Sequence, residues 1–308
     1  MTIIKCNGLE KQYKGEPEFA LSGLNLTVEE KTIFGFLGPN GAGKTTTIKI
    51  LTGMMKPTGG EATVAGEQVR LNSVSLRRKI GYLGQEPRMY GWMKGLELLV
   101  FVGKVFGFSE AESKKRANEM LLMAGLSEAA NKKISAYSGG MLQRLGIAQA
   151  LMGKPEVLFL DEPTSSLDPI GRKEVLEFIQ ILKKDMTIFM STHILSDVER
   201  ICDTVAIIDQ GKLVVQDKML ELRKRYAAKQ LELIFETPKA FLSFLEEAKG
   251  MNWDTASNAE LRKVTIQSAD IDRVRHECLG LISVHHFSID KFEMKDASLE
   301  DVFVKLIG

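Results

Sequence analysis

The chain has 308 residues, a net charge of +1 and an apolar content of 44%, which are ordinary values for a globular protein. Its length allows two domains, and its near-zero charge argues against a dedicated nucleic-acid binder. The three cysteines lie far apart, with no metal-site or disulfide spacing, which fits a reducing cytoplasm. The N-terminal residues lack a signal-peptide core, and no apolar run reaches the roughly 18 residues of a membrane helix. We expect a protein that acts from outside the bilayer.

The first 53 residues predict strands followed by a loop and a helix. Residues 1 to about 35 alternate in the manner of short strands, in TIIKCNGLEKQY and ALSGLNLTVEE. The segment TIFGFLG (32–38) is apolar throughout and predicts a buried strand. It leads into the glycine-rich stretch GPNGAGKTT (38–46), after which a helix is expected to end at Gly53.

The next part of the chain predicts a parallel sheet with a helical insertion. A hairpin (61–69) and a strand, RRKIGYLGQ (77–85), are expected first, and residues from about 86 to 152 then become helical. Two buried strands, VLFLDEP (157–163) and TIFMSTH (187–193), flank a helix (169–182), and a hairpin (205–217) follows. Strands that alternate with helices favour an α/β fold with a parallel sheet.

Past Asp217 the composition changes, and residues 218–308 predict a small α+β domain. A charged helix (218–230) would serve as a linker, with a solvated basic face. The expected strands are 231–236, 262–267 and 283–290, and the expected helices are 239–250, 270–281 and 299–307. A further strand from MNWDTAS (251–257) would make the arrangement ferredoxin-like.

The stretch GPNGAGKTT fits the phosphate-binding pattern G-x-x-x-x-G-K-[ST], through Gly38, Gly43, Lys44 and Thr45. Glycines let backbone N–H groups converge on an anion, towards which the next helix also directs its positive end. Lys44 would reach the β- and γ-phosphates, and Thr45 would give its hydroxyl to Mg²⁺. A flexible turn is the alternative, which the strand before and the helix after disfavour.

Polar residues at the ends of the other buried strands suggest what the phosphate is for. Asp161 suits Mg²⁺ and Glu162 suits a general base for the attacking water, although an acidic strand cap is the alternative. His193 and Gln85 end neighbouring strands, so they could contact the γ-phosphate and Mg²⁺; a structural role is equally open for each.

The segment AYSGGMLQR (136–144) predicts a second anion site. Ser138 is a good N-cap, and the two glycines expose N–H groups at the start of a helix. One nucleotide does not need two such loops in one fold. The hypothesis is that this helix start binds the nucleotide held by a second copy; a plain helix cap is the alternative.

In their order, these motifs resemble the nucleotide-binding domain of ABC transporters over about residues 2–217. The resemblance implies a P-loop NTPase core with an N-terminal antiparallel β subdomain and a head-to-tail homodimer around two ATP molecules. Glu162, His193 and Gln85 would be catalytic, and Thr45, Gln85 and Asp161 would hold Mg²⁺. ATP would contact Tyr13, Gly38, Pro39, Asn40, Gly41, Ala42, Gly43, Lys44, Thr45 and Thr46, and from the partner copy Ser138, Gly139, Gly140 and Asp168. A strand aromatic in the core is the alternative for Tyr13.

Two positions depart from the family pattern: Tyr137 stands where leucine is commonest and Ser166 where glycine is usual. Neither change removes a catalytic group, so both sites of a homodimer are expected to be competent. The ending DASLEDVFVKLIG (296–308), after the added domain, resembles ATP-binding subunits of bacterial drug, sodium or lantibiotic exporters. That implies a separate membrane permease and a place at the cytoplasmic membrane face. The added domain would brace the dimer or regulate it, with an inert appendage as the alternative.

The segment EPRMYGWMKGLELLVF (86–101) is dense in methionine and aromatic residues and would dock a helix of the permease. The core of the helical block is the alternative. Two rival classes are an ABC-type ATPase acting on nucleic acid or ribosomes and a small-molecule kinase. The single cassette and near-zero charge disfavour the first, and YSGGM disfavours the second. The sequence does not indicate the cargo.

Overall fold

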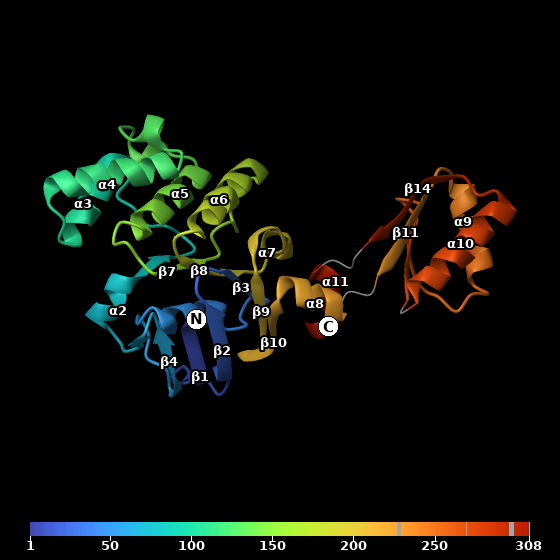
Figure 1. Cartoon of the computed structure of the whole chain (residues 1–308), viewed down its shortest axis with the longest axis horizontal. Coiled ribbons are helices and arrows are strands. Elements are labelled where there is room, and N and C mark those ends of the chain that lie inside the picture. The colour runs from blue at the N-terminus through green and yellow to red at the C-terminus, as the bar shows by residue number, and fades with distance from the viewer. Residues whose placement is uncertain (227–228, 269, 296–298, 308) are drawn as a thin grey trace. The chain divides into compact units, whose positions relative to one another are not determined.

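A computed structural model describes residues 1–226, 229–268, 270–295 and 299–307. The chain divides into two compact units, Met1–Met219 and Leu220–Gly308 (Figure 1). Among the described residues, none of the helices has both the length and the apolar character needed to cross a membrane.

A six-stranded sheet of order β10-β9-β3-β8-β7-β6 lies at the centre of the first unit. All neighbouring strands are parallel except the β9–β10 hairpin. The strands are β3 (Ile33–Leu37), β6 (Ile80–Leu83), β7 (Val157–Asp161), β8 (Thr187–Thr192), β9 (Thr204–Asp209) and β10 (Lys212–Lys218). Because β3, β7 and β8 point the same way, the polar segments that follow them lie at one edge of the sheet.

The N-terminal part of this unit forms a second, antiparallel sheet of order β2-β1-β4-β5. Its strands are β1 (Thr2–Gln12), β2 (Phe19–Glu29), β4 (Gly59–Val64) and β5 (Glu67–Gln68). Helix α1 (Lys44–Leu51) shares one apolar core with both sheets, in which Ile48, Leu21 and Phe36 are fully buried. This core fixes the start of α1, and therefore the glycine-rich loop before it, against the central sheet.

The remaining helices of the first unit include the predicted helical block, whose helices α3, α4 and α5 lie together in Figure 1. Ser138 caps α5 by accepting a hydrogen bond from the Met141 N–H (3.3 Å), as predicted. The helices are α2 (Val74–Lys79), α3 (Gly95–Val105), α4 (Glu110–Met123), α5 (Gly139–Ala150), α6 (Pro169–Leu182) and α7 (Leu195–Ile201), with short 3₁₀ turns at Ser127–Ala129 and Ile134–Ala136. The predicted α/β fold with its β subdomain and helical block is confirmed.

The second unit contains an antiparallel sheet of order β12-β13-β11-β14, and α9 and α10 pack on it over one apolar core. Its elements are α8 (Met219–Tyr226), β11 (Gln230–Phe235), α9 (Pro238–Ala248), β12 (Asp254–Asn258), β13 (Lys263–Gln267), α10 (Ile271–His285), β14 (Ile289–Lys295) and α11 (Leu299–Ile307). From β11 to β14 the order is βαββαβ. A strand around Asp254 therefore completes the ferredoxin-like arrangement.

Three details of the sequence prediction are wrong. The strand expected at 77–85 begins at Ile80, because Ser73 caps the short helix α2 through the Leu76 N–H. The strand expected at 283–290 begins at Ile289, because α10 continues to His285 and ends where His286 takes a left-handed φ of 52°. Helix α7 was not predicted, since its seven residues show too little periodicity.

Candidate active site

The glycine-rich loop between β3 and α1 has a backbone that other residues would strain. Gly41 and Gly43 have φ values of 83° and 103°, in the left-handed region. A Cβ on Gly38 would lie 2.3 Å from the carbonyl oxygen of Ile208, so only glycine fits there. This backbone turns the chain sharply into the N-terminus of α1, where N–H groups are free to bind an anion.

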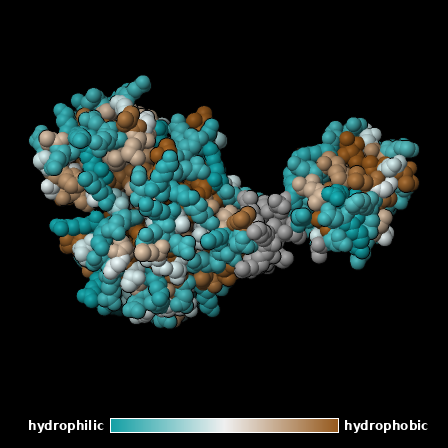
Figure 2. Space-filling view, viewed as in Figure 1, coloured by the Kyte–Doolittle hydropathy of each residue, from teal (hydrophilic) through white to brown (hydrophobic). Residues whose placement is uncertain are grey.

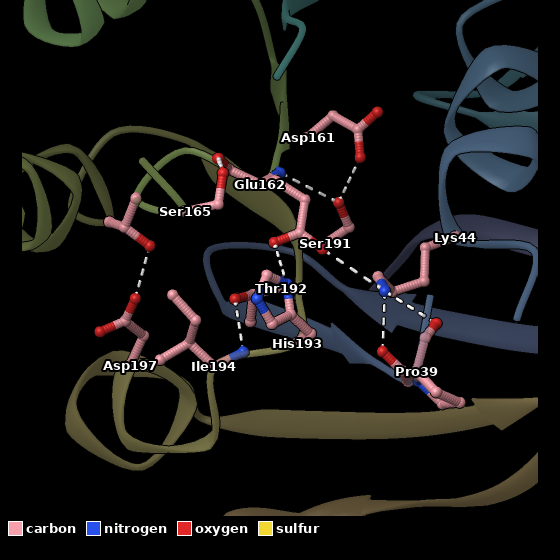
Figure 3. Close-up of polar contacts among 12 residues, drawn as sticks. Pro39, Lys44, Asp161, Glu162, Ser165, Ser191, Thr192, His193, Ile194 and Asp197 are labelled. Carbon is pink, nitrogen blue, oxygen red and sulfur yellow. Dashed lines mark hydrogen bonds and ion pairs between the residues drawn. The ribbon is translucent and has the colours of Figure 1, made fainter. Parts of the chain in front are cut away.

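Lys44, the first residue of α1, bends back over this loop (Figure 3). Its Nζ donates hydrogen bonds to the carbonyl oxygens of Gly38 (2.7 Å) and Pro39 (3.1 Å) and lies 3.4 Å from Glu162 Oε1. The buried ammonium group is thereby held between the loop and the end of β7. A phosphate in the loop would lie within its reach.

Asp161, the last residue of β7, faces the start of α1. Its Oδ1 accepts hydrogen bonds from Ser191 Oγ (2.6 Å) and Thr45 Oγ1 (3.2 Å). Burial and the charge of Asp161 raise the pKa of Tyr82 on the neighbouring strand. Among the described residues, no group of three or more His, Cys, Asp or Glu could hold a metal. One carboxylate with a hydroxyl fits Mg²⁺ bound mainly through phosphate and water oxygens.

Glu162 follows the last residue of β7, Asp161, and no longer has the extended backbone of the strand. Its φ of 52° is left-handed, and its N–H points to the oxygen atoms of Ser191, at 3.1 Å from the carbonyl and 3.2 Å from Oγ. Adjacent strand residues face opposite sides, so this turn lets both carboxylates face the glycine-rich loop. Glu162 Oε2 also pairs with His193 Nδ1 at 2.8 Å (Figure 3). A buried carboxylate held by a cation and an imidazole can accept a proton from water.

These side chains surround a cavity of about 380 Å³ at the edge of the central sheet. Tyr13 lies at its rim, where its hydroxyl is 3.0 Å from Thr46 Oγ1. Ala20, which the sequence did not suggest, is also part of the wall. The cavity is lined by Tyr13, Ala20, Pro39, Asn40, Gly41, Gly43, Lys44, Thr45, Thr46, Gln85, Glu162 and His193. Gly38, Ala42 and Asp161 are not part of this wall, although Gly38 accepts a hydrogen bond from Lys44 and Asp161 accepts one from Thr45.

The other predicted residues form a second group, outside this wall. Ser138 caps α5, and Asp168 caps α6 by accepting from the Gly171 N–H (3.2 Å). A Cβ on Gly140 would lie 3.0 Å from Gly171 Cα, so the starts of the two helices touch. The structure therefore gathers the predicted residues into two sets, one around the cavity and one at the paired starts of α5 and α6.

A family model described as ABC transporter matches residues 21–165. An ABC transporter ATP-binding protein of Bacillus subtilis, YxlF, is 39% identical over 99% of this chain and 99% of its own length. The chain belongs to the ATP-binding proteins of ABC transporters. The bacitracin transport ATP-binding protein BcrA of Bacillus licheniformis is 37% identical, over 100% of this chain and 98% of its own. The daunorubicin/doxorubicin resistance ATP-binding protein DrrA of Streptomyces peucetius is 33% identical, over 99% of this chain and 92% of its own length.

Solved structures of this family match between two thirds and three quarters of the chain. The ATP-binding cassette MJ0796, in a dimeric post-hydrolysis state bound to ADP and Pi, is 28% identical with a TM-score of 0.64, over 70% of this chain and 99% of its own. The cbiO1 protein of Clostridium perfringens is 27% identical with a TM-score of 0.66, over 73% of this chain and 94% of its own. The chain is thus an ATPase subunit that uses ATP and Mg²⁺. Subunits of this family form dimers and pair with transmembrane permeases.

Two polar residues around this candidate site were missed from the sequence. Ser191 joins Asp161 to the backbone of Glu162, and its place in the STH motif was the available signal. The buried Asp197 accepts from Thr164 Oγ1 (2.5 Å) and from Arg172 Nε (2.5 Å), which ties α7 to the segment after Glu162 and to α6. It lies beyond the motifs, where periodicity gave no sign of a buried carboxylate.

Tyr137, one of the two departures from the family pattern, is accommodated by a glycine. Its hydroxyl donates to the Ala129 carbonyl oxygen at 2.7 Å. A Cβ on Gly95 would lie 2.4 Å from the Tyr137 hydroxyl oxygen, so only glycine leaves room for it. Burial raises the pKa of Tyr137, so its hydroxyl stays neutral and able to donate. The larger side chain therefore joins the segment before Ser138 to the start of α3.

Proposed function

We propose that two copies of this chain close on two ATP molecules, and that this closure drives a separate permease that exports a drug, peptide, lipid or ion. The support for export comes from full-length relatives: BcrA carries bacitracin transport in its name, and DrrA carries daunorubicin/doxorubicin resistance. These alignments include the second unit as well as the ATPase unit. The chain would then act at the cytoplasmic face of the membrane.

The observation that carries the dimer proposal is the division of the site residues into two sets. The cavity supplies a phosphate loop, an ammonium group and a carboxylate, but its wall does not include Ser138, Gly139 or Gly140. The start of α5 nevertheless offers N–H groups at a positive helix end. A second copy that presents this helix start to the cavity would complete the site, and Asp168 would lie in the same interface.

Within each cavity the proposed roles follow from the contacts. Thr45, Asp161 and Gln85 offer the oxygen atoms that Mg²⁺ prefers, and the ion would neutralise phosphate charge when bound. Lys44 would hold the phosphates. Glu162 would accept a proton from the attacking water, while His193 fixes the orientation of its carboxylate through the 2.8 Å contact.

The permease would dock on the exposed apolar residues between β6 and α4. Trp92 is 72% exposed and Tyr90 57% exposed, with ring centroids 6.0 Å apart, and Phe101 and Val105 on α3 are also exposed. Figure 2 shows hydrophobic residues (brown) among hydrophilic ones (teal) over the part of the molecule where Figure 1 labels α3, α4 and α5. Exposed aromatic residues are frequent anchors of protein interfaces, so this surface suits a helix of a membrane partner.

The second unit is proposed to support the dimer or to regulate it. It has a core of its own, built on Leu231, Phe244 and Val274. Alignments with relatives such as YxlF, over 99% of both chains, extend through it. An accessory role explains why the ATPase and the added unit occur together in these relatives.

The test is the substitution Glu162→Gln, which keeps the side chain's size and removes its ability to accept a proton. Turnover is expected to fall by about 10²- to 10⁴-fold, and an ATP-bound dimer should accumulate. ATP hydrolysis and light scattering after size exclusion measure the two effects. Glu128→Gln, on an exposed turn, is the matched control. Full ATPase activity of Glu162→Gln, or a single chain at saturating ATP, would contradict the proposal.

A further inference from the structure

The side chain of Gln143 is buried in α5 yet not fully hydrogen-bonded. Its Nε2 donates to the backbone carbonyl oxygen of Gln85 at 3.2 Å, and it is 3% exposed. Among the described residues, its Oε1 has no hydrogen-bond partner. A buried amide with an unpaired oxygen is destabilising by about 1–3 kcal/mol, so stability alone does not account for glutamine at this position.

One turn further along, α5 touches the same loop through a glycine. A Cβ on Gly146 would lie 2.5 Å from Leu83 Cδ1 and 3.5 Å from Pro87 Cβ. Residues three apart lie on one face of a helix, so Gln143 and Gly146 seat the same face of α5 on residues 83–87. This loop carries Gln85, which lines the cavity.

The N-terminal half of α5 is also joined to α6, which lies beside it in Figure 1. Gly140 and Gly171 touch at the helix starts, and Arg144 forms an ion pair with Glu174 on α6 (3.0 Å). A displacement of α5 would therefore carry the starts of both helices. These are the parts of the chain that the proposed dimer presents to the other copy.

We propose that Gln143 is a positioning residue that couples the two ATP sites. It would link the loop at Gln85, which senses the nucleotide in its own cavity, to the Ser138–Gly140 helix start, which completes the partner's cavity. The inference rests on the dimer proposed above. Any displacement of this loop by nucleotide at Gln85 would be passed to α5 through the hydrogen bond to Gln143 and the close packing at Gly146.

The experiment compares Gln143→Met with its parent in the Glu162→Gln background, in the full chain. Methionine keeps the length of the side chain and removes the donor. The ATP affinity of the dilute single chain should not change, because Gln143 does not line the cavity. The protein concentration for half-maximal ATP-bound dimer should rise about fivefold, the equivalent of one neutral hydrogen bond. A fluorescent ATP analogue measures the affinity, and light scattering measures the dimer.

Two further variants and one further readout separate coupling from a structural role. Gln149→Met, near the end of α5, is the matched control and should behave as the parent does. Gly146→Ala, which pushes Leu83 away, should weaken the dimer in the same direction as Gln143→Met. The thermal midpoint of Gln143→Met should match the control, because the substitution also removes an unpaired acceptor.

Three outcomes would overturn the inference. The first is an unchanged dimer in Gln143→Met, the second is a weaker ATP affinity of its single chain, and the third is a thermal midpoint well below that of Gln149→Met. The absence of any ATP-dependent dimer in the Glu162→Gln parent would instead refute the proposed function, and this inference with it.

Discussion

The two units of the chain each bury a glutamate, and the surroundings of the two carboxylates differ. Glu162 follows β7 at the sheet edge, where Lys44 and His193 contact its two oxygen atoms beside the cavity. Glu232 lies within β11 and is surrounded by the ammonium groups of three lysines from the flanking strands: Lys263 (2.5 Å), Lys295 (3.0 Å) and Lys291 (3.6 Å).

The contacts of the two carboxylates indicate which buried charge takes part in chemistry. Burial alone would raise the pKa of Glu232, but hydrogen bonds and charges from Lys263 and Lys295 lower it to about 2. The lysines of β13 and β14 cover this carboxylate as diagonal neighbours across the strands, so its contacts stabilise the sheet. One partner of Glu162, Lys44, also contacts the glycine-rich loop, and Glu162 lines the cavity. Access to a cavity, rather than burial, separates the catalytic candidate from the structural one.

Lys44→Met is expected to have the largest effect on ATP hydrolysis among the substitutions that test this comparison. The substitution removes the buried ammonium group that contacts Glu162 and would hold the phosphates, so ATP hydrolysis should fall by about 10³-fold. The thermal midpoint should also fall, because the substitution leaves the buried Glu162 carboxylate without its ammonium partner. Lys49→Met on the same helix is the control and should keep its activity. A Lys44→Met protein with near-normal ATPase activity would place Glu162 in the same structural class as Glu232.

Ser191→Ala is expected to have the second-largest effect, a fall in kcat. Ser191 Oγ donates to Asp161 at 2.6 Å and lies 3.2 Å from the Glu162 backbone nitrogen, so its loss leaves both carboxylates less well positioned. We expect kcat to fall by about 30-fold, the equivalent of about 2 kcal/mol for a hydrogen bond to a charged group. Ser113→Ala is the matched control, because that hydroxyl is equally buried and has no partner among the described residues. Equal kcat values for the two variants would rule out a positioning role for Ser191.

Glu232→Gln is expected to have the third-largest effect, a loss of stability in the second unit alone. The lowered pKa means that the Glu232 carboxylate stabilises the folded unit above pH 4.5, its ordinary pKa, and that this is lost as the pH falls towards 2. At pH 7 the variant should be less stable by about 2 kcal/mol, and the difference should shrink between pH 4.5 and 2. ATP affinity should not change.

Fluorescence can follow the second unit by itself. The chain has two tryptophans, and Trp253 packs against Phe244 in the core of this unit. In a Trp92→Phe background, urea titrations at several pH values would report the unfolding of the second unit. A stability difference that stays constant down to pH 2 would contradict the assigned cause.

Motif spacing predicted most of the cavity, and the reason is physical. A glycine loop of this kind must follow a buried strand and precede a helix, so Lys44 could be placed at the candidate site without coordinates. The side chain of Gln143 could not, because its partner is a backbone carbonyl 58 residues away, which no side-chain pattern encodes. The turn at Glu162 was hidden for a related reason, since a left-handed φ at a glutamate leaves no compositional sign. Long-range contacts to backbone atoms are the part of the site that the sequence does not reveal.

The smallest effect is expected from Tyr137→Phe, which tests whether a position just before the Ser138–Gly140 helix start is enough to make a buried polar group functional. Its hydroxyl contacts Ala129 and the start of α3 rather than the cavity, so the loss should be about 1 kcal/mol of stability with kcat unchanged. Gly95→Ala sharpens the test through a double-mutant cycle. Its Cβ would collide with the hydroxyl 2.4 Å away, so it should destabilise the parent more than Tyr137→Phe, in which that oxygen is gone. Thermal unfolding of the four proteins measures the coupling. Additive losses would contradict the contact between Tyr137 and Gly95. A fall in kcat for Tyr137→Phe would show that cavity access is not what divides the two classes of buried polar group.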